Sequence, residues 1–132
     1  ANRNKDYSNY GHDVIEGVRC ELDVRVKRAL KAGVRRWNVV LDPGIGFSKS
    51  VEDNVRLIRH HAKINISETV GGAISHSLDD SPRPGLVGFP TLVGTSRKGF
   101  LGDIVARETA RKNAKNRDWA TAAAVTSLVQ QG

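Results

Sequence analysis

Two short apolar runs, each preceded by a helical pattern, constrain the fold of this chain more than any other feature. They are residues 37–41 (Trp-Asn-Val-Val-Leu) and 90–94 (Pro-Thr-Leu-Val-Gly). Both contain β-branched residues and little polar alternation, which is typical of strands covered on both faces. Because a helical pattern separates them, the sequence predicts βα units with parallel strands and right-handed connections.

The strongest helical pattern covers residues 13–32. Asp13 is suited to cap the first turn, and Glu16 stands at the spacing of a capping box. Gly33 follows the pattern and can adopt the left-handed conformation that ends a helix. One apolar stripe recurs every four residues along this segment. It consists of Val14, Val18, Leu22, Val26 and Leu30.

Three further helices are expected. One starts near Ser50, a short one covers residues 100–105, and the last runs from Trp119 to about Gln130 with Asp118 as its cap. The last segment is apolar on nearly every side, so we expect it to be buried. Residues 67–88 are rich in Gly, Pro and Ser and are expected to form a loop insertion.

Chain length limits how these units can be completed. Two parallel strands alone would leave both sheet edges unpaired, and a (β/α)₈ barrel needs about 250 residues. The chain has 132 residues. We therefore predict an α/β fold over residues 1–132 that is part of a (β/α)₈ TIM barrel.

Composition excludes several classes of protein. Twenty-one basic and 14 acidic residues give a formal net charge of +7, which fits a solvated basic surface or a site for an anion. Basic residues do not alternate with aromatic ones, so nucleic-acid binding is weakly supported. No apolar run is long enough to cross a membrane, and no secretory signal is expected at the N-terminus. The single Cys20 excludes an internal disulfide.

The first candidate site is the segment 41–47, at the end of the first predicted strand. Ligands of parallel α/β folds bind at this end of the strands. Asp42 could accept two parallel hydrogen bonds from a guanidine-like N–C–N edge of a heterocycle. Alternatively, it caps its own turn as an Asx-turn before Pro43. Gly44 and Gly46 would let the loop turn and let a flat ligand approach.

The second candidate site is the segment 93–98, at the end of the second predicted strand. It contains the hydroxyls of Thr95 and Ser96 and the cations Arg97 and Lys98, which could hold an anion or polarise a carbonyl. Alternatively, this segment is a solvated loop without a binding function. The presence of Asp42 at the other strand end favours a site. By contrast, the His60–His61 pair lacks the further ligands that a metal site requires.

At these two segments the sequence resembles the dihydropteroate synthases. LDPGIGFSK matches the DPGxGF-K loop of that family, and LVGTSRKGFLG matches its VG-SRK loop. The resemblance extends over most of the chain and is greatest to the fungal multifunctional folate-synthesis enzymes. It implies the later βα units of a (β/α)₈ barrel. It also implies an enzyme that joins 7,8-dihydropterin-6-ylmethyl diphosphate to 4-aminobenzoate and releases diphosphate.

The resemblance further implies roles for six residues. Asp42 would receive the 2-amino and ring N–H groups of the pterin, and Lys98 would approach its carbonyl edge, which makes this pair the expected catalytic residues. Gly94 would contact the pterin or its neighbourhood through its backbone. The 4-aminobenzoate pocket, where sulfonamides compete, would be formed by Phe47, Ser96, Arg97 and Lys98.

The family pattern also predicts what this chain would need. Its aspartate- and asparagine-bearing loops and its Arg-x-His motif, which serve diphosphate and Mg²⁺, are not found in the sequence. We therefore expect Mg²⁺ as cofactor through ligands outside the chain, and no activity from the chain alone. The parent enzyme is expected to be a homodimer in the cytoplasm or mitochondria, without nucleic-acid or membrane partners.

Two other functions stay open at this point. One is another pterin-binding barrel, such as a methyltetrahydrofolate methyltransferase, although those enzymes do not usually carry SRK after the later strand. The other, much weaker, is a basic module that binds polyanions without catalysis.

Overall fold

The computed structural model describes residues 13–65, 86–109 and 117–131. The predicted insertion at 67–88 lies outside these residues except for its last three positions. The elements in chain order are α1 (Val14–Lys31), η1 (Arg36–Asn38), α2 (Val51–Arg59), η2 (His61–Ile64), α3 (Gly99–Thr109) and α4 (Arg117–Val129), where η is a 3₁₀ helix.

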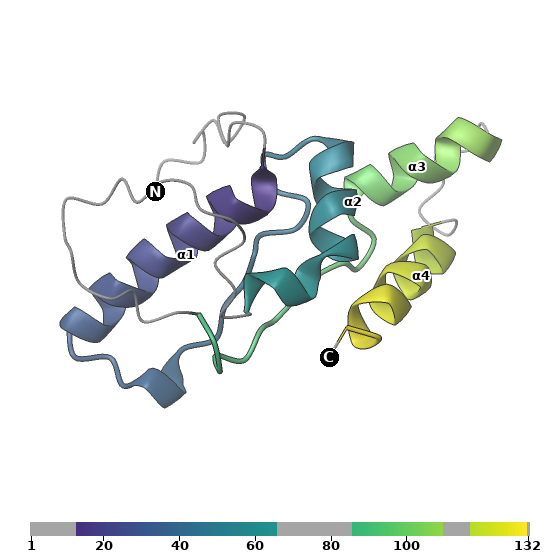
Figure 1. Ribbon diagram of the computed structural model, residues 1–132. Helices are drawn as coiled ribbons and strands as arrows, with labels where there is room; N and C mark the ends of the chain where they lie inside the picture. The colour runs from purple at the N-terminus through teal and green to yellow at the C-terminus, as the bar shows by residue number, and fades with distance from the viewer. Residues whose placement is uncertain (1–12, 66–85, 110–116, 132) are drawn as a thin grey trace.

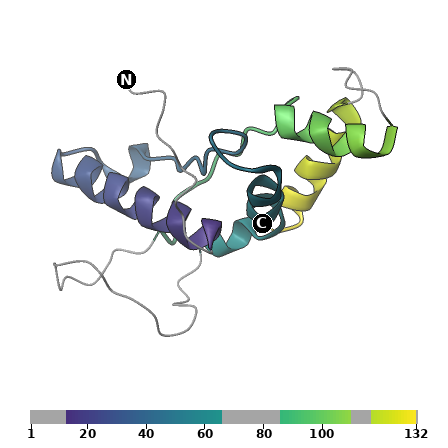
Figure 2. The same cartoon turned by 90° about the horizontal axis from the view of Figure 1, so that it is seen from above.

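Helix α2 holds the described elements together. It packs against α1 on one side and against α3 and α4 on the other. Figure 1 shows α1 at one end of the molecule and the α3–α4 pair at the opposite end, and the view from above in Figure 2 shows the same order. None of the described helices is long and apolar enough to cross a membrane.

Helix α1 confirms the pattern predicted for residues 13–32. The Asp13 side chain accepts a hydrogen bond from Ile15 N at 3.0 Å, and Gly33 ends the helix with a φ of +89°. The predicted stripe is buried or half-buried. The predicted capping box was wrong for Glu16. Its carboxylate does not return to the backbone of Asp13 but lies along the helix, with Oε2 3.9 Å from Arg19 Nε.

Helix α2 begins where its capping chemistry predicts. The Ser50 hydroxyl accepts a hydrogen bond from Asp53 N at 3.0 Å, and the Asp53 carboxylate accepts one from Ser50 N at 3.3 Å. These reciprocal bonds form a capping box and satisfy two backbone donors that a helix start otherwise leaves without partners. The box fixes where the loop that precedes α2 must end.

Helix α4 departs from expectation in two ways. It begins at Arg117, so Asp118 lies inside the first turn and does not cap the helix. We expected burial on nearly every side, but Trp119 is 83% exposed and Val129 is 72% exposed. The reason is geometric: one face of α4 packs on α2 and α3, and no other described element covers the rest.

The two predicted strands are reduced to one parallel bridge between Leu41 and Thr91. Leu41 N donates to Pro90 O at 2.9 Å, and Leu92 N donates to Leu41 O at 2.8 Å. The expectation of strands covered on both faces was wrong for Trp37, which lies in η1 and is 73% exposed. A pair of strands is marginally stable without further strands beside it, and within the described residues these segments pair only with each other.

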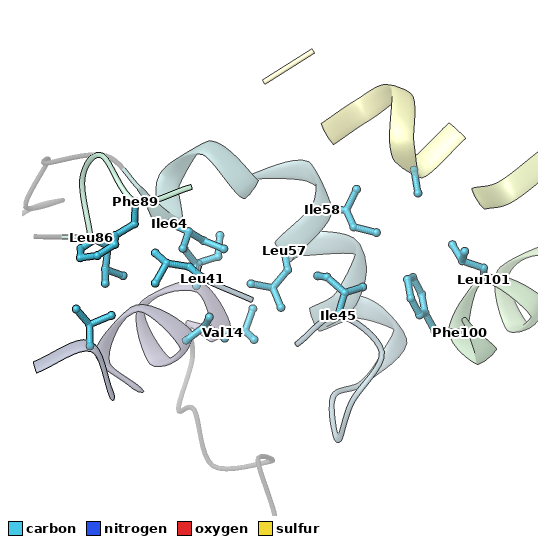
Figure 3. Close-up of a cluster of buried hydrophobic side chains, with 14 residues drawn as sticks. Val14, Leu41, Ile45, Leu57, Ile58, Ile64, Leu86, Phe89, Phe100 and Leu101 are labelled. Atoms are coloured by element: carbon cyan, nitrogen blue, oxygen red, sulfur yellow. The ribbon is translucent and has the colours of Figure 1, made fainter. Parts of the chain in front are cut away.

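The hydrophobic core runs along the molecule beneath α2. Figure 3 shows Leu41 and Leu57 near its middle, with Phe89 toward one end and Phe100 toward the other. Leu41 and Leu57 are no more than 2% exposed, and burying such a side chain contributes about 1.5–3 kcal/mol. The bridge at Leu41 is therefore held in the core, and the chain leaves it toward the candidate site.

Candidate functional site

The two candidate segments lie next to each other because the Leu41–Thr91 bridge is parallel. Both segments leave the bridge in the same direction. Lys98 Nζ lies 4.0 Å from the centre of the Phe47 ring, a distance at which a cation is attracted to the face of an aromatic ring. The structure thus joins the first segment to the second through Phe47 and Lys98.

Gly46 brings the two loops into closer contact than any other residue could. Its φ is +80°, and a Cβ built at this position would lie 2.8 Å from Lys98 Cδ. A side chain here would have to displace the Lys98 stem. The glycine therefore serves the turn and also leaves the space that Lys98 occupies.

Asp42 is exposed and has one oxygen fixed by its own turn. Its Oδ1 accepts a hydrogen bond from Gly44 N at 2.8 Å, which is the Asx-turn that the residues left open. Among the described residues, Oδ2 has no hydrogen-bond donor. The two alternatives for Asp42, an Asx-turn and a ligand site, are therefore compatible, since the turn uses one carboxylate oxygen and orients the other.

Lys49 supports the same loop from below. Its Nζ donates to Gly44 O at 2.8 Å and to Phe47 O at 3.3 Å. Burial lowers the pKa of Lys49 below its usual range, against the opposing effect of nearby carboxylates that include Glu21 and Asp42. Lys49 belongs to the matched LDPGIGFSK motif, but its role as a loop support was not predicted.

Asn54 is the second support that sequence reasoning missed. It is 1% exposed, and its Oδ1 accepts a hydrogen bond from Gly46 N at 2.6 Å. Its Nδ2 donates to Ser50 O at 2.8 Å and to Lys49 O at 3.3 Å. The first turn of α2 is thereby fastened to the glycine turn that faces Lys98.

A pocket of about 280 Å³ opens between α1 and the Asp42 loop. From the loop it is lined by Asp42, Pro43, Gly44, Phe47 and Lys49, and from α1 by Val18, Glu21, Leu22 and Arg25. Its lining combines apolar side chains with charged side chains of both signs. Such a pocket can hold a small flat polar ligand.

The second segment presents a mixture of open and engaged groups. Gly94 is exposed, and nothing lies within 4 Å of the position its Cβ would take. Ser96 is also exposed, whereas Thr95 is buried. The Arg97 guanidinium is engaged with Asp118, with Nε at 2.7 Å from Oδ1 and Nη2 at 3.0 Å from Oδ2.

Metal-ligating side chains do not gather in the part of the chain that the structure describes. No group of three or more His, Cys, Asp or Glu side chains is found there. His61 lies against Thr91, with Nε2 3.2 Å from Oγ1, at the edge of a separate pocket of about 480 Å³. That pocket contains none of the predicted site residues.

The comparison with protein families identifies the kind of protein. Residues 1–132 match the family model described as pterin binding enzyme. This chain belongs to the pterin binding enzyme family. The two loops that meet at Phe47 and Lys98 carry the motifs by which the sequence resembles it.

Relatives of the chain include folate-synthesis proteins of fungi and plants. It is 34% identical over 125 residues to the folic acid synthesis protein fol1 of Pneumocystis carinii, and this match covers 95% of the chain and 14% of that protein. It is 40% identical over 131 residues to the mitochondrial folate synthesis bifunctional protein of Arabidopsis thaliana, covering 98% of this chain and 21% of that protein.

Solved structures of dihydropteroate synthases share its fold. The Xanthomonas albilineans enzyme in complex with 7,8-dihydropteroate matches 97% of this chain and 40% of its own, with a TM-score of 0.70 and 28% identity. The match to the Thermus thermophilus enzyme in complex with 4-aminobenzoate covers 92% of this chain and 37% of that enzyme, with a TM-score of 0.65 and 33% identity. The chain thus spans well under half the length of these synthases.

Proposed function

We propose that this chain is the pterin-facing part of a dihydropteroate synthase, built from the later βα units of a (β/α)₈ barrel. The parent enzyme would join 7,8-dihydropterin-6-ylmethyl diphosphate to 4-aminobenzoate. The observation that carries the proposal is the geometry of Asp42. One carboxylate oxygen is held by Gly44 N at 2.8 Å, and the loop it belongs to touches the Lys98 loop.

Asp42 is assigned the recognition of the pterin. An ionised carboxylate can accept hydrogen bonds from the 2-amino group and a ring N–H of the pterin, which together present a planar pair of donors. The Asx-turn sets the rotation of the carboxylate before the ligand arrives. Preorganisation of this kind reduces the entropy lost on binding.

Lys98 and its neighbours are assigned the carbonyl edge of the pterin and the 4-aminobenzoate. The three donors of the Lys98 ammonium suit the pterin carbonyl edge, and the open backbone at Gly94 allows a ring to approach closely. Phe47, whose side chain is 62% exposed, offers a face for an aromatic ring. Phe47, Ser96 and Lys98 would line the 4-aminobenzoate pocket, where sulfonamides would compete, and Arg97 would belong to its wall through its backbone, because its guanidinium is engaged with Asp118.

The reaction would create charge that the Asp42 carboxylate would stabilise. The C–O bond between the pterin methylene and diphosphate breaks, and the bond from the same carbon to the 4-aminobenzoate nitrogen forms. The nitrogen then loses one proton. As diphosphate departs, positive charge develops on the pterin and its methylene carbon. A carboxylate bound to the pterin ring would favour that charge, since a fixed negative charge close to a developing positive charge lowers the energy of the transition state.

Mg²⁺ is assigned no ligand among the described residues, because they contain no group of suitable side chains. When bound by the parent enzyme, the ion would supply charge neutralisation on the diphosphate. The solved synthases are more than twice as long as the part this chain matches. We therefore expect the purified 132-residue chain to form no dihydropteroate from both substrates with Mg²⁺. We also expect the parent enzyme to be a homodimer in the cytoplasm or mitochondria.

The test is Asp42→Asn in the full-length protein, with titration calorimetry of the dihydropterin diphosphate. Asn can keep the bond from Gly44 N through its oxygen, which leaves its NH₂ facing the donors of the pterin. A buried mismatch of that kind costs about 1–3 kcal/mol, or about 5- to 150-fold in affinity.

The control variant is Asp23→Asn on α1, which removes a carboxylate that lies 3.4 Å from Lys27 Nζ and outside the pocket. Its affinity should equal that of the wild type. Unchanged pterin affinity in Asp42→Asn would refute the assignment. Methyl transfer to a corrinoid acceptor, without dihydropteroate formation, would favour the methyltransferase alternative instead.

A further inference from the structure

Arg97 lies in the second candidate segment, yet its side chain is committed to another part of the protein. Both N–H groups on one side of its guanidinium donate to the Asp118 carboxylate, at 2.7 and 3.0 Å. This paired arrangement fixes orientation as well as distance, unlike a single contact between point charges. Asp118 belongs to the first turn of α4.

The backbone of Arg97 is held by the same helix. Arg97 N donates to Thr121 Oγ1 at 3.1 Å, and Arg117 Nη1 donates to Arg97 O at 3.1 Å. The φ of Arg97 is +50°, a region that residues with a side chain rarely occupy and that the surroundings must impose. Thr121 thus contacts the backbone N–H of Arg97, Arg117 its carbonyl oxygen and Asp118 its guanidinium. These three residues are here called the α4 clamp.

Lys98 follows Arg97 directly, so the clamp also determines where Lys98 begins. Lys98 N donates to Thr95 O at 3.3 Å and closes the turn around Arg97. Its side chain then runs past Gly46 and ends over the Phe47 ring. If the left-handed residue relaxes, the direction of the Lys98 side chain changes with it.

Arg117 connects the clamp to α3 as well. A Cβ built on Gly102 of α3 would lie 3.1 Å from Arg117 Nε, so the Arg117 side chain lies directly against the helix that begins after Lys98. The Ser96–Lys98 turn is consequently held between two packed helices. Figure 1 shows α3 and α4 side by side at this end of the molecule.

We propose that Arg97 is a positioning residue that acts through Asp118, and that the α4 clamp sets the placement of Lys98 in the pterin and 4-aminobenzoate site. This inference rests on the proposed function for what Lys98 does, but not for how Lys98 is held. It assigns Arg117, Asp118 and Thr121, none of which lies in either motif, to the support of the site.

The test uses the full-length protein with Asp118→Asn, Arg97→Asp and the exchanged pair Arg97→Asp/Asp118→Arg. A misplacement of Lys98 by about 1 Å should lower kcat/KM by about ten- to a hundredfold in each single variant. The exchanged pair should recover most of that loss, because it restores opposite charges at the same two positions. Amide hydrogen exchange of residues 95–101 should accelerate in Asp118→Asn and return toward the wild-type rate in the exchanged pair.

Asp13→Asn is the matched control. Asp13 also forms an exposed ion pair between elements, 3.7 Å from Arg56 on α2, and Asn preserves its helix cap. This variant should keep both kcat/KM and the exchange rate of residues 95–101. Thermal unfolding of all variants checks that a lost activity reflects the site and not global unfolding.

Two results would overturn the inference. One is Asp118→Asn with unchanged kcat/KM and unchanged exchange of residues 95–101. The other is an exchanged pair that is no better than Arg97→Asp alone, which would mean that substrate meets the guanidinium directly. The exchange measurement needs no turnover. If the wild type forms no dihydropteroate but Asp118→Asn still loosens residues 95–101, the clamp stands and the proposed function fails.

Discussion

The side-chain amide of Asn54 and the backbone amide of Gly46 are joined by a hydrogen bond of 2.6 Å. Asn54 is 1% exposed and also donates to two carbonyl groups that precede α2. One buried side chain therefore serves three backbone groups of the loop that carries Asp42. Because a buried polar group without a partner is costly, the loop conformation depends on this residue more than on any exposed one.

Asn54→Leu should lower the free energy of unfolding by about 1–3 kcal/mol, because Gly46 N loses its acceptor and two side-chain bonds to the carbonyl groups before α2 are lost. Urea unfolding measures the change. Asn38→Leu is the control, since Asn38 is exposed in η1, and such surface changes usually stay within about 0.5 kcal/mol. Equal effects of the two substitutions would show that Asn54 does not hold the loop.

Gly46→Ala should reduce pterin affinity in the full-length protein, because the new Cβ would meet Lys98 Cδ at 2.8 Å. Gly33→Ala is a close control: its φ is +89°, but nothing lies within 4 Å of its Cβ position. Both variants carry a left-handed strain of about 1–2 kcal/mol. Only Gly46→Ala should change binding, and a loss of affinity in both would point to strain alone.

The capping box of α2 should behave as one unit. Ser50→Ala removes the acceptor for Asp53 N, and Asp53→Ala removes the acceptor for Ser50 N and its hydroxyl. Each change should cost about 1 kcal/mol. The double variant should cost less than the sum, since the residues share partners. Strict additivity in urea unfolding would mean that the two caps act independently.

Both ends of α1 and the start of α2 were predictable because they depend on local chemistry. Asp13 and Ser50 offer side-chain acceptors for backbone donors within the next three residues, and Gly33 offers a left-handed stop. Each signal acts over a few residues of chain. The structure places these three residues at the helix ends that the sequence predicted.

The strands and the burial of α4 were less predictable, because a pattern reports that residues are apolar but not what covers them. Trp37 and Val129 fit an apolar run equally well whether or not a neighbour packs on them. The first two residues of the run, Trp37 and Asn38, lie in η1 instead, in which the side chain of Arg36 lies over the Phe89 ring at 3.8 Å.

The site was half predictable for a similar reason. Asp42 and Lys98 stand in recognisable motifs at the ends of apolar runs. Asn54 is a single polar residue within a helical pattern, and nothing in the sequence states that it turns inward to Gly46. The Arg97–Asp118 pair joins positions 21 residues apart, a separation at which one sequence gives no sign of contact.

His61 should make stability depend on pH. It is 6% exposed, its Nε2 pairs with Thr91 Oγ1 at 3.2 Å, and its Nδ1 is buried without a partner among the described residues. Burial lowers its pKa from the ordinary value of 6.5. Between this lowered pKa and about pH 6.5 the unfolded chain therefore binds a proton that the folded chain does not.

The sign follows from that difference. Stability from this residue is complete above about pH 6.5 and falls as the pH drops toward the folded pKa, by up to about 1.4 kcal/mol per pH unit. Urea unfolding of the wild type and of His61→Leu, measured from about pH 7.5 down to about pH 5, isolates this contribution from the other titrating groups. The difference between the two proteins should shift in favour of His61→Leu as the pH falls. A difference that stays constant with pH would show that His61 takes up its proton as readily in the folded chain as in the unfolded one.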